Sequence, residues 1–216
     1  EAFSDMLFFS LHPDGGRHVP DRAAGIRVLP ELHLLREDIS AVVDLSFGRS
    51  RRPTADDPLG LPLALHASYQ REEILAALGY ASQERPPADF REGVLKVEVR
   101  GRTIDAFFVT LKKSEADYSP STLYRDYPIS PSLLHWESQS TTSVASPTGR
   151  RYLNGESTVL LFVRQQRTCD TGTAPYTYLG PAEYVSHTGD RPIAITWRLA
   201  RPMPAELYLD SALQAV

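Results

Sequence analysis

The 216-residue sequence contains a single cysteine and no apolar run close to the ~20 residues that a membrane-spanning helix needs. Cys169 alone cannot form an internal disulfide framework or a zinc site that uses several cysteines. Residues 1–11 lack the basic stretch and the long apolar core of a secretory signal peptide. These absences predict a protein without membrane contact that works in the cytoplasm.

Signals for metal or cofactor chemistry are also scarce. The six histidines show no spacing typical of a ligand pair. Asp105 precedes Lys112 at a suggestive distance, but Thr110 stands where a metal-dependent nuclease needs a second carboxylate, and a hydroxyl anchors Mg²⁺ poorly. We therefore expect no catalytic residue, no cofactor and no metal. Whether this chain alone is an enzyme stays open, with nuclease activity as the alternative.

Composition favours a folded domain with a substantial core. Hydrophobic residues make up 42% and aromatic residues 9% of the chain, which excludes intrinsic disorder. The formal net charge is −4, yet residues 91–168 carry +3 while the other segments are negative. This mild excess permits a local basic face but is far below the dense basic stripe of many DNA-binding modules.

The chain changes its pattern near residue 60. Residues 29–45 place apolar side chains at helical spacing, and residues 49–60 are rich in proline and aspartate, which is typical of a linker. A second helix is predicted over residues 70–78, with Ser68 as N-cap and Gly79 as the stop. We expect three parts: an N-terminal helical extension over 1–60, a β-rich domain over 61–206 and a C-terminal tail over 207–216.

From Gly93 onward, alternating and β-branched residues predict strands. Residues 94–99 and 103–111 flank a glycine turn and form a hairpin signal. Further strands are expected at 157–164, 176–180, 183–186 and 194–199. The fold class is predicted as α+β, with a dominant curved antiparallel β-sheet or barrel, a packed helix and the N-terminal helical extension. Residues 112–152 are polar and aromatic with poor periodicity, and long loops of this kind are often functional.

Six blocks of sequence occur in an order that is specific to one family. They are His66–Ile74, Phe108–Ser114 with Tyr118–Tyr127, His135–Ser143, Gly149–Tyr152, Leu161–Arg164 and Tyr176–Gly180. Together they resemble the uncharacterised domain family at the C-terminal end of bacterial superfamily II helicases, over roughly residues 60–205. Those helicases often carry a phospholipase-D-like nuclease domain and resemble restriction or phage-defence enzymes.

The resemblance implies that this domain acts together with another protein domain. The 216 residues contain no Walker A lysine motif, no helicase Asp-Glu box and no His-x-Lys nuclease motif. A helicase or nuclease domain of the same chain or operon is therefore the expected protein partner, and DNA is the expected ligand.

Three groups of residues are candidates for nucleic-acid contact. Tyrosines and hydroxyls suit base stacking and phosphate contacts, and the predicted residues of this first group are Tyr118, Ser119, Thr122, Tyr124 and Arg125. The second group combines a tryptophan that would serve as a stacking platform or a pocket wall with uncharged hydrogen-bonding groups, in His135, Trp136, Ser138, Gln139 and Ser140. The third group is basic and would contact phosphates through Lys112, Lys113, Arg150, Arg151 and Arg164.

Three functions from different classes follow. The first is a non-catalytic DNA-binding module, with a modified base as one candidate target, that directs a helicase or nuclease in a restriction or defence system. The second is a metal-dependent DNA endonuclease domain built on Asp105 and Lys112. The third is a protein-interaction or sensor domain that regulates a defence ATPase.

Overall fold

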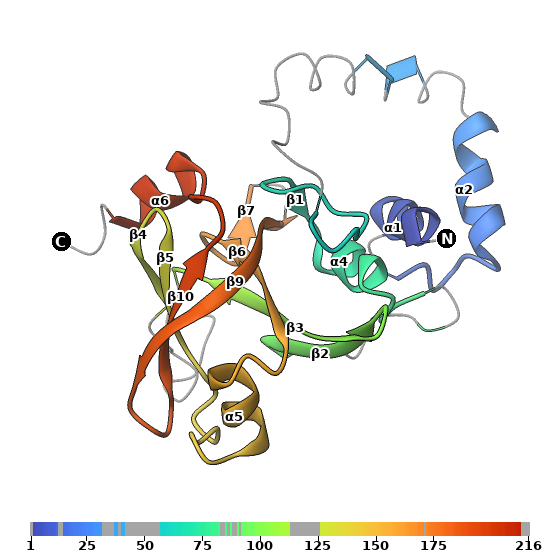
Figure 1. The fold of residues 1–216 in the computed structure, drawn as a ribbon. Coiled ribbons are helices and arrows are strands. Elements are labelled where there is room, and N and C mark those ends of the chain that lie inside the picture. The colour runs from blue at the N-terminus through green and yellow to red at the C-terminus, as the bar shows by residue number, and fades with distance from the viewer. Residues whose placement is uncertain are drawn as a thin grey trace. The chain divides into compact units, whose positions relative to one another are not determined.

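The computed structural model describes residues 2–12, 15–31, 37–38, 40–41, 57–82, 85, 87, 90, 92–112, 126–170 and 172–212 (Figure 1). The chain divides into two compact units, Glu1–Arg91 and Glu92–Val216, and we describe each by itself. The boundary predicted near residue 60 stays a prediction.

The described part of the first unit is mainly helical. Its elements are α1 (Ala2–Leu11), α2 (Arg22–Glu31), the short strand β1 (Ser68–Tyr69) and α4 (Arg71–Ala77). α1 packs on α4, and the fully buried Phe8, Ile74 and Leu75 belong to these two helices. An ion pair of 2.7 Å between Arg22 and Asp5 joins α2 to α1. An apolar contact between helices and the Arg22–Asp5 ion pair thus stabilise the described part of this unit.

The helix predicted over 70–78 is confirmed as α4. Its N-cap is Gln70, whose backbone N–H donates to the Glu73 carboxylate at 2.6 Å, rather than Ser68. Gly79 follows the helix with a φ of 68°, as expected for a stop glycine. The helix predicted over 29–45 overlaps the end of α2 and lies mostly outside the described residues.

The second unit is built on one mixed sheet with the strand order β2-β3-β6-β9-β10-β5-β4. β3 and β6 run parallel, and the other neighbours in this order are antiparallel. The strands are β2 (Val94–Val99), β3 (Arg102–Thr110), β4 (Tyr127–Ser130), β5 (Leu133–Glu137), β6 (Thr158–Arg164), β9 (Tyr176–Thr188) and β10 (Ala194–Leu199). The α+β class is confirmed. The closed barrel offered as an alternative is wrong, because β2 and β4 remain as separate edges.

The sheet is nevertheless strongly curved. Phe107 on β3 and Trp136 on β5 are separated by three strands in the sheet order, yet their ring centroids lie 4.2 Å apart. β9 follows this curvature as one long bent strand, with a register shift against β6 between Leu161 and Phe162 (Figure 1). The two strands predicted at 176–180 and 183–186 are therefore one continuous strand.

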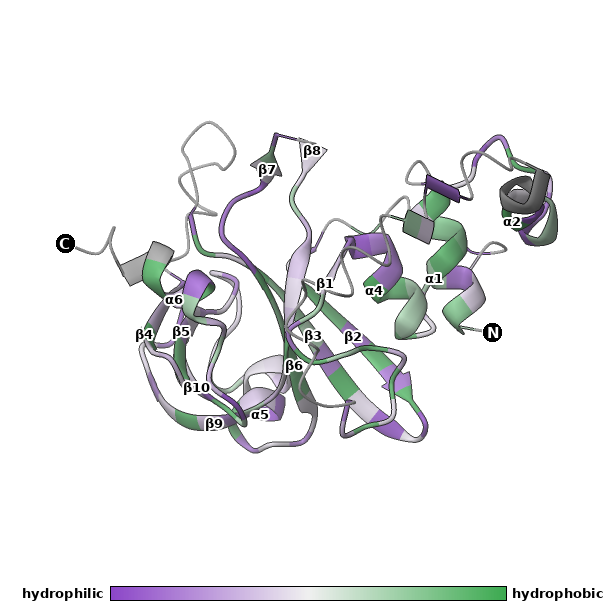
Figure 2. Ribbon diagram, turned by 90° about the horizontal axis from the view of Figure 1, so that it is seen from above, coloured by the Kyte–Doolittle hydropathy of each residue, from purple (hydrophilic) through white to green (hydrophobic). Residues whose placement is uncertain are grey.

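The hairpin predicted around Gly101 is confirmed by β2 and β3. Arg100 and Gly101 both have positive φ, 50° and 76°, which is the backbone of a two-residue turn that matches the strand twist. β6 is a central strand that is buried over nearly its full length, and its ribbon is hydrophobic in Figure 2. A continuous apolar run is typical of a strand covered on both faces.

Residues 112–152 contain more regular structure than their periodicity predicts. The described part holds the hairpin β4–β5 and the helix α5 (Pro147–Leu153). α5 starts with Ser146 as N-cap and Pro147 in the first turn, a start signal that local sequence carries. The ribbon of β7 (Thr168–Cys169) with β8 (Gly172–Thr173) and the helix α6 (Ala205–Ala212) complete this unit.

The main core lies on the concave side of the sheet. Alternate residues of β3, β5, β6 and β10 fill it, among them Phe107, Trp136, Leu161 and Trp197. α5 contributes Tyr152 and α6 contributes Leu207 to the same cluster. α5 is therefore a helix packed against the sheet, and it closes one end of the core.

Candidate nucleic-acid interface

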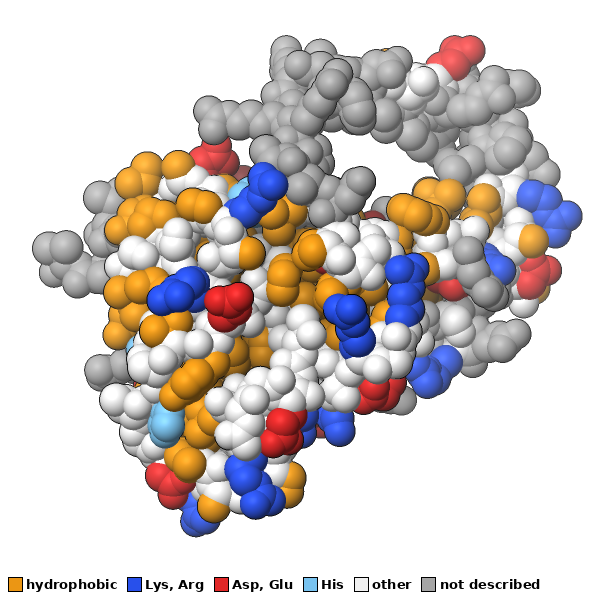
Figure 3. Space-filling view, in the orientation of Figure 1, with side chains coloured by type: hydrophobic (Ala, Val, Ile, Leu, Met, Phe, Trp, Pro, Cys, Tyr) orange, Lys and Arg blue, Asp and Glu red, His pale blue; other side chains and the backbone are white. Residues whose placement is uncertain are grey.

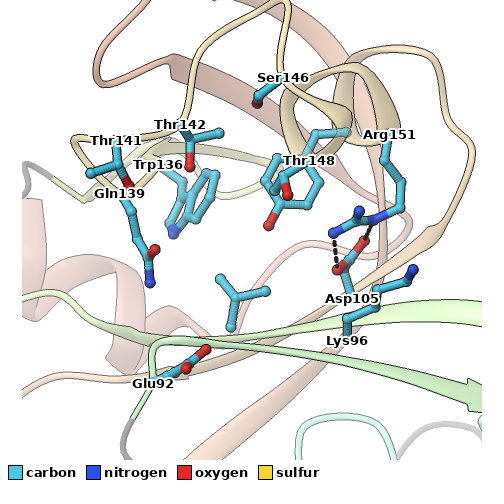
Figure 4. Close-up of a pocket in the computed structure, with 12 residues that line it drawn as sticks. Glu92, Lys96, Asp105, Trp136, Gln139, Thr141, Thr142, Ser146, Thr148 and Arg151 are labelled. Atoms are coloured by element: carbon cyan, nitrogen blue, oxygen red, sulfur yellow. Dashed lines mark hydrogen bonds and ion pairs between the residues drawn. The ribbon is translucent and has the colours of Figure 1, made fainter.

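A cleft of about 440 Å³ opens in the second unit beside α5 (Figure 4). We name it the α5 cleft. It lies within the size range of about 300–1,000 Å³ that is usual for small-molecule sites. Its lining comes from the start of β2, from β3, from the end of β5, from the segment that follows β5 and from α5. The lining residues are Glu92, Val94, Lys96, Asp105, Trp136, Gln139, Thr141, Thr142, Ser146, Thr148, Arg151 and Tyr152.

Regular backbone geometry explains why several of these side chains face one space. Thr148, Arg151 and Tyr152 stand three and four residues apart in α5, so they share one helical face. Lys96 and Asp105 are directly opposite in the β2–β3 ladder, and directly opposed residues project from the same face of a sheet. A strand pair and a helix face thus form two walls of the cleft.

The third wall is the segment 138–146, which we name the β5–α5 loop. Ser138 is fully buried, and its hydroxyl accepts from the backbone N–H of Ile193 at 2.9 Å. The backbone N–H of Val144 donates to Asp190 at 2.7 Å. The Ser146 hydroxyl accepts from the N–H of Gly149 at 3.0 Å and donates to the Ser143 carbonyl at 2.6 Å. The loop is therefore anchored at its beginning, middle and end.

Gly149 allows α5 to approach this loop. A Cβ atom added at Gly149 would lie 2.0 Å from the carbonyl oxygen of Ser143, which is backbone and cannot swing away. Only glycine fits such a close approach, although its own φ lies in the ordinary helical range. The position of the β5–α5 loop thus depends on having glycine at position 149.

Aromatic rings form the inner end of the cleft. Trp136 is only 6% exposed, and it stacks on Phe107 with an angle of 27° between the ring planes. Tyr152 meets the indole edge to face at 5.8 Å. In Figure 4 the indole nitrogen of Trp136 points into the open space. Because Phe107 covers one face of the indole, the tryptophan offers the cleft its N–H edge.

A charged pair lines the wall beside Tyr152. Arg151 donates to both carboxylate oxygens of the fully buried Asp105, at 2.7 and 3.1 Å. Ser157 adds a third hydrogen bond at 2.6 Å. The bond to Asp105 raises the pKa of the Arg151 guanidinium. Bidentate pairing of this kind fixes the arginine side chain in one orientation.

Tyr152 remains a neutral phenol over a wide pH range. Burial raises the pKa of its hydroxyl well above the usual value, and the negative charge of Asp105 adds to the rise, whereas Arg151 opposes it. The guanidinium carbon of Arg151 lies 5.4 Å from the centre of the tyrosine ring. Tyr152 is therefore suited to hydrogen bonding and not to proton abstraction.

Several polar groups that line the cleft are unused. Among the described residues, no hydrogen-bond partner is found for the Trp136 indole N–H or for the side chains of Gln139, Thr141, Thr142 and Thr148. Gln139 reaches across the opening toward Glu92 in Figure 4. A set of unused donors and acceptors on an anchored frame can bind a polar ligand without rearrangement.

The formal charges that line the cleft cancel. Asp105 and Arg151 neutralise each other directly, and Glu92 and Lys96 carry one charge of each sign. On the face of the second unit that Figure 3 shows, Lys and Arg side chains are scattered, several of them beside Asp or Glu, and do not form a stripe. The cleft is thus suited to a neutral polar group.

Three of the residues predicted for nucleic-acid contact meet at the cleft: Trp136, Gln139 and Arg151. The stacking predicted for Trp136 does not match its position, because the ring is packed into the core. Two other predicted residues are buried and engaged. Ser138 anchors the loop as described, and Arg164, 7% exposed, donates to Thr110 at 3.0 Å and to the Ala174 carbonyl at 3.1 Å. Neither side chain is therefore available to bind a ligand.

The other described candidates lie outside the cleft lining. His135 stacks on Tyr127, with ring centroids 4.5 Å apart. Lys112 is half-buried, while Ser140 and Arg150 are exposed. The remaining candidates lie outside the described residues: Lys113, Tyr118, Ser119, Thr122, Tyr124 and Arg125.

Sequence reasoning did not assign ligand contacts to most of the lining residues. Thr148 and Tyr152 carry a signal that was available, since the Ser146-Pro147 start predicts a helix and helical spacing then groups them with Arg151. Val94 and Lys96 carry no such signal, because the pairing of distant strands is what brings β2 near α5. Asp105, weighed above as a metal ligand, is instead saturated by Arg151 and Ser157.

Among the residues that the structure describes, no three His, Cys, Asp or Glu side chains gather closely enough to hold a metal ion. None of the described helices has the length and apolar character needed to cross a membrane.

The fold is an α+β domain, and its second unit carries a polar cleft whose formal charges cancel. The chain belongs to the family described as a domain of unknown function, DUF3427, whose match covers residues 63–210. No curated protein matches the sequence.

Proposed function

We propose that the second unit is part of a non-catalytic DNA-binding module, in which the α5 cleft holds one unstacked base. In this proposal the module directs a helicase or nuclease, in the same chain or operon, to its target in a restriction or phage-defence system. The ordered sequence blocks that resemble helicase-associated domains support the second part. The unused hydrogen-bonding groups in the cleft support the first part.

The observation that carries the proposal is that Trp136 and Gln139 lie side by side and face the same opening (Figure 4). An indole N–H is a donor only, while a glutamine amide offers both a donor and an acceptor. Base edges carry such mixed patterns, and glutamine matches the adenine edge with two hydrogen bonds. An unstacked base that enters edge first would satisfy groups that now lack a partner within the described part of the chain.

The geometry changes how the base is expected to be held. Enzymes and readers that extract a base commonly stack it between aromatic side chains. Here Phe107 already occupies one face of Trp136. We therefore expect recognition by hydrogen bonds to the base edge, with Val94 as an apolar contact on the β2 side of the cleft.

A binding assay with two substitutions tests the proposal. Gln139→Ala removes the amide, and Trp136→Phe removes the indole N–H but keeps an aromatic ring to pack on Phe107. Each should weaken binding of a fluorescent duplex with one mismatched base by about two- to tenfold, since a single hydrogen bond contributes about 0.5–1.5 kcal/mol. Fluorescence anisotropy of the 216-residue protein measures the affinity.

Gln166→Ala is the matched control, because Gln166 is exposed, lies in the same unit and does not line the cleft. The mismatched duplex should bind more tightly than a fully paired one, since a mismatched base costs less to unstack. Equal losses for Gln139→Ala and Gln166→Ala, or no binding to duplex or single-stranded DNA at two salt concentrations, would contradict the proposal. Preferential binding of RNA would do so as well.

A further inference from the structure

The cleft offers more hydrogen-bonding groups than one base edge can use. Trp136 and Gln139 already match an edge, and the hydroxyls of Thr141, Thr142 and Thr148 remain beyond that pair. These three hydroxyls also have no partner among the described residues. A polar group that loses water on ligand binding and gains no partner costs about 1–3 kcal/mol. The complementary ligand should therefore carry several polar groups in addition to those of a base.

The size of the cleft agrees with a larger ligand. Its volume of about 440 Å³ equals the space of about 15 water molecules at about 30 Å³ each. A base is a flat ring system only about 3.4 Å thick, which is the stacking distance within one DNA strand. Such a ring alone would leave much of the cleft filled with water.

The charges limit what the additional groups can be. The Asp105 carboxylate is fully engaged with Arg151 and Ser157, and Glu92 and Lys96 balance each other. A phosphate or an amine would meet no excess of opposite charge in this lining. Hydroxyl groups match the threonines, since each hydroxyl both donates and accepts.

From this lining we propose that the α5 cleft accepts a DNA base that carries a hexosyl group. The base edge meets Trp136 and Gln139, and the sugar hydroxyls meet Thr141, Thr142 and Thr148. This proposal rests on the proposed function, because it specifies the chemical class of the base that the same site binds. The anchored β5–α5 loop holds Thr141 and Thr142 in place before the ligand arrives, and α5 holds Thr148.

The test compares four duplexes that differ at one central cytosine: unmodified, 5-methyl, 5-hydroxymethyl and glucosylated 5-hydroxymethyl. Fluorescence anisotropy of the 216-residue protein should show at least about tenfold tighter binding of the glucosylated duplex than of the unmodified one. Thr142→Val replaces the hydroxyl by a methyl group of similar size and should reduce this preference. Thr188→Val makes the same change at an exposed site away from the cleft and should retain it.

Each outcome separates this proposal from the one it rests on. Equal affinity for all four duplexes, or a preference that survives Thr142→Val, overturns the hexosyl assignment while DNA binding stands. Binding of free methyl glucoside as tight as that of the glucosylated duplex overturns the link to a DNA base. Binding to none of the duplexes overturns both proposals. Thermal unfolding of each variant confirms that the comparison is made between folded proteins.

Discussion

Arg150 and Arg151 are neighbours in α5 whose side chains have different surroundings. Arg150 is exposed, whereas Arg151 pairs with the fully buried Asp105 through two hydrogen bonds. A buried carboxylate that loses its partner keeps the full cost of its desolvation. Arg151 therefore stabilises the fold and shapes the cleft wall, and a charge reversal at this position would test stability before it tests DNA binding.

Replacing Arg151 should destabilise the second unit far more than replacing Arg150. We expect Arg151→Met to lower the free energy of unfolding by about 3–5 kcal/mol, the usual cost of breaking a buried ion pair from one side. Arg150→Met, the control, should change it by less than about 0.5 kcal/mol. Denaturant unfolding followed by tryptophan fluorescence measures both. Similar values for the two variants would show that the pair with Asp105 contributes little.

Among the elements, the β5–α5 loop decides the form of the cleft. It has no regular secondary structure beyond its turns, yet both ends and the middle are tied by hydrogen bonds to Ile193, Asp190 and Gly149. The loop joins β5, a strand of the sheet, to α5, and the packing of α5 against the sheet sets the span of the loop. An irregular segment can thus be as well ordered as the elements that it connects.

Gly149→Ala should move this loop without dissolving the sheet. The added Cβ meets the Ser143 carbonyl, so either α5 or the loop must shift, at a cost of about 1–3 kcal/mol. We expect lower thermal stability and weaker binding of the mismatched duplex, with unchanged strand content by circular dichroism. Gly93→Ala is the control, because a Cβ at Gly93 meets no atom within 4 Å. Wild-type affinity in Gly149→Ala would mean that the loop position does not matter for binding.

At the scale of the whole molecule, two tyrosines make the free energy of unfolding depend on pH in the alkaline range. Burial raises the pKa of Tyr69 in the first unit and of Tyr152 in the second. A tyrosine whose pKa is higher in the folded than in the unfolded protein favours folding while it is protonated. Its contribution is complete below the unfolded value of about 10 and is lost as the pH rises toward the folded value.

The free energy of unfolding should therefore fall as the pH rises above about 10. Tyr152→Phe keeps the ring but removes the ionising hydroxyl, so the fall attributable to the second unit should become smaller. Tyr208→Phe is the control, since Tyr208 is a half-buried tyrosine of the same unit outside the cleft lining. Urea unfolding at a series of pH values measures the slope. A slope that Tyr152→Phe leaves unchanged would contradict the assignment.

The features that could be predicted from sequence are those with local causes. The hairpin around Gly101 depends on two residues with positive φ, β6 on an apolar run, and the end of α4 on Gly79. Three of the candidate residues, Trp136, Gln139 and Arg151, line the cleft, and they were chosen for local richness in aromatic, amide and basic groups. The helix α5 was also within reach, because Ser146 and Pro147 are local start signals.

The cleft itself has no local cause. Arg151 lies 46 residues from Asp105, and Phe107 stacks on Trp136 only because the sheet curves through the three strands that separate β3 from β5. Side-chain chemistry is a property of each residue, so the sequence shows which groups are able to bind. Whether a group is used up inside the fold, as in Ser138 and Arg164, or left unused, as in Gln139, depends on contacts between distant segments.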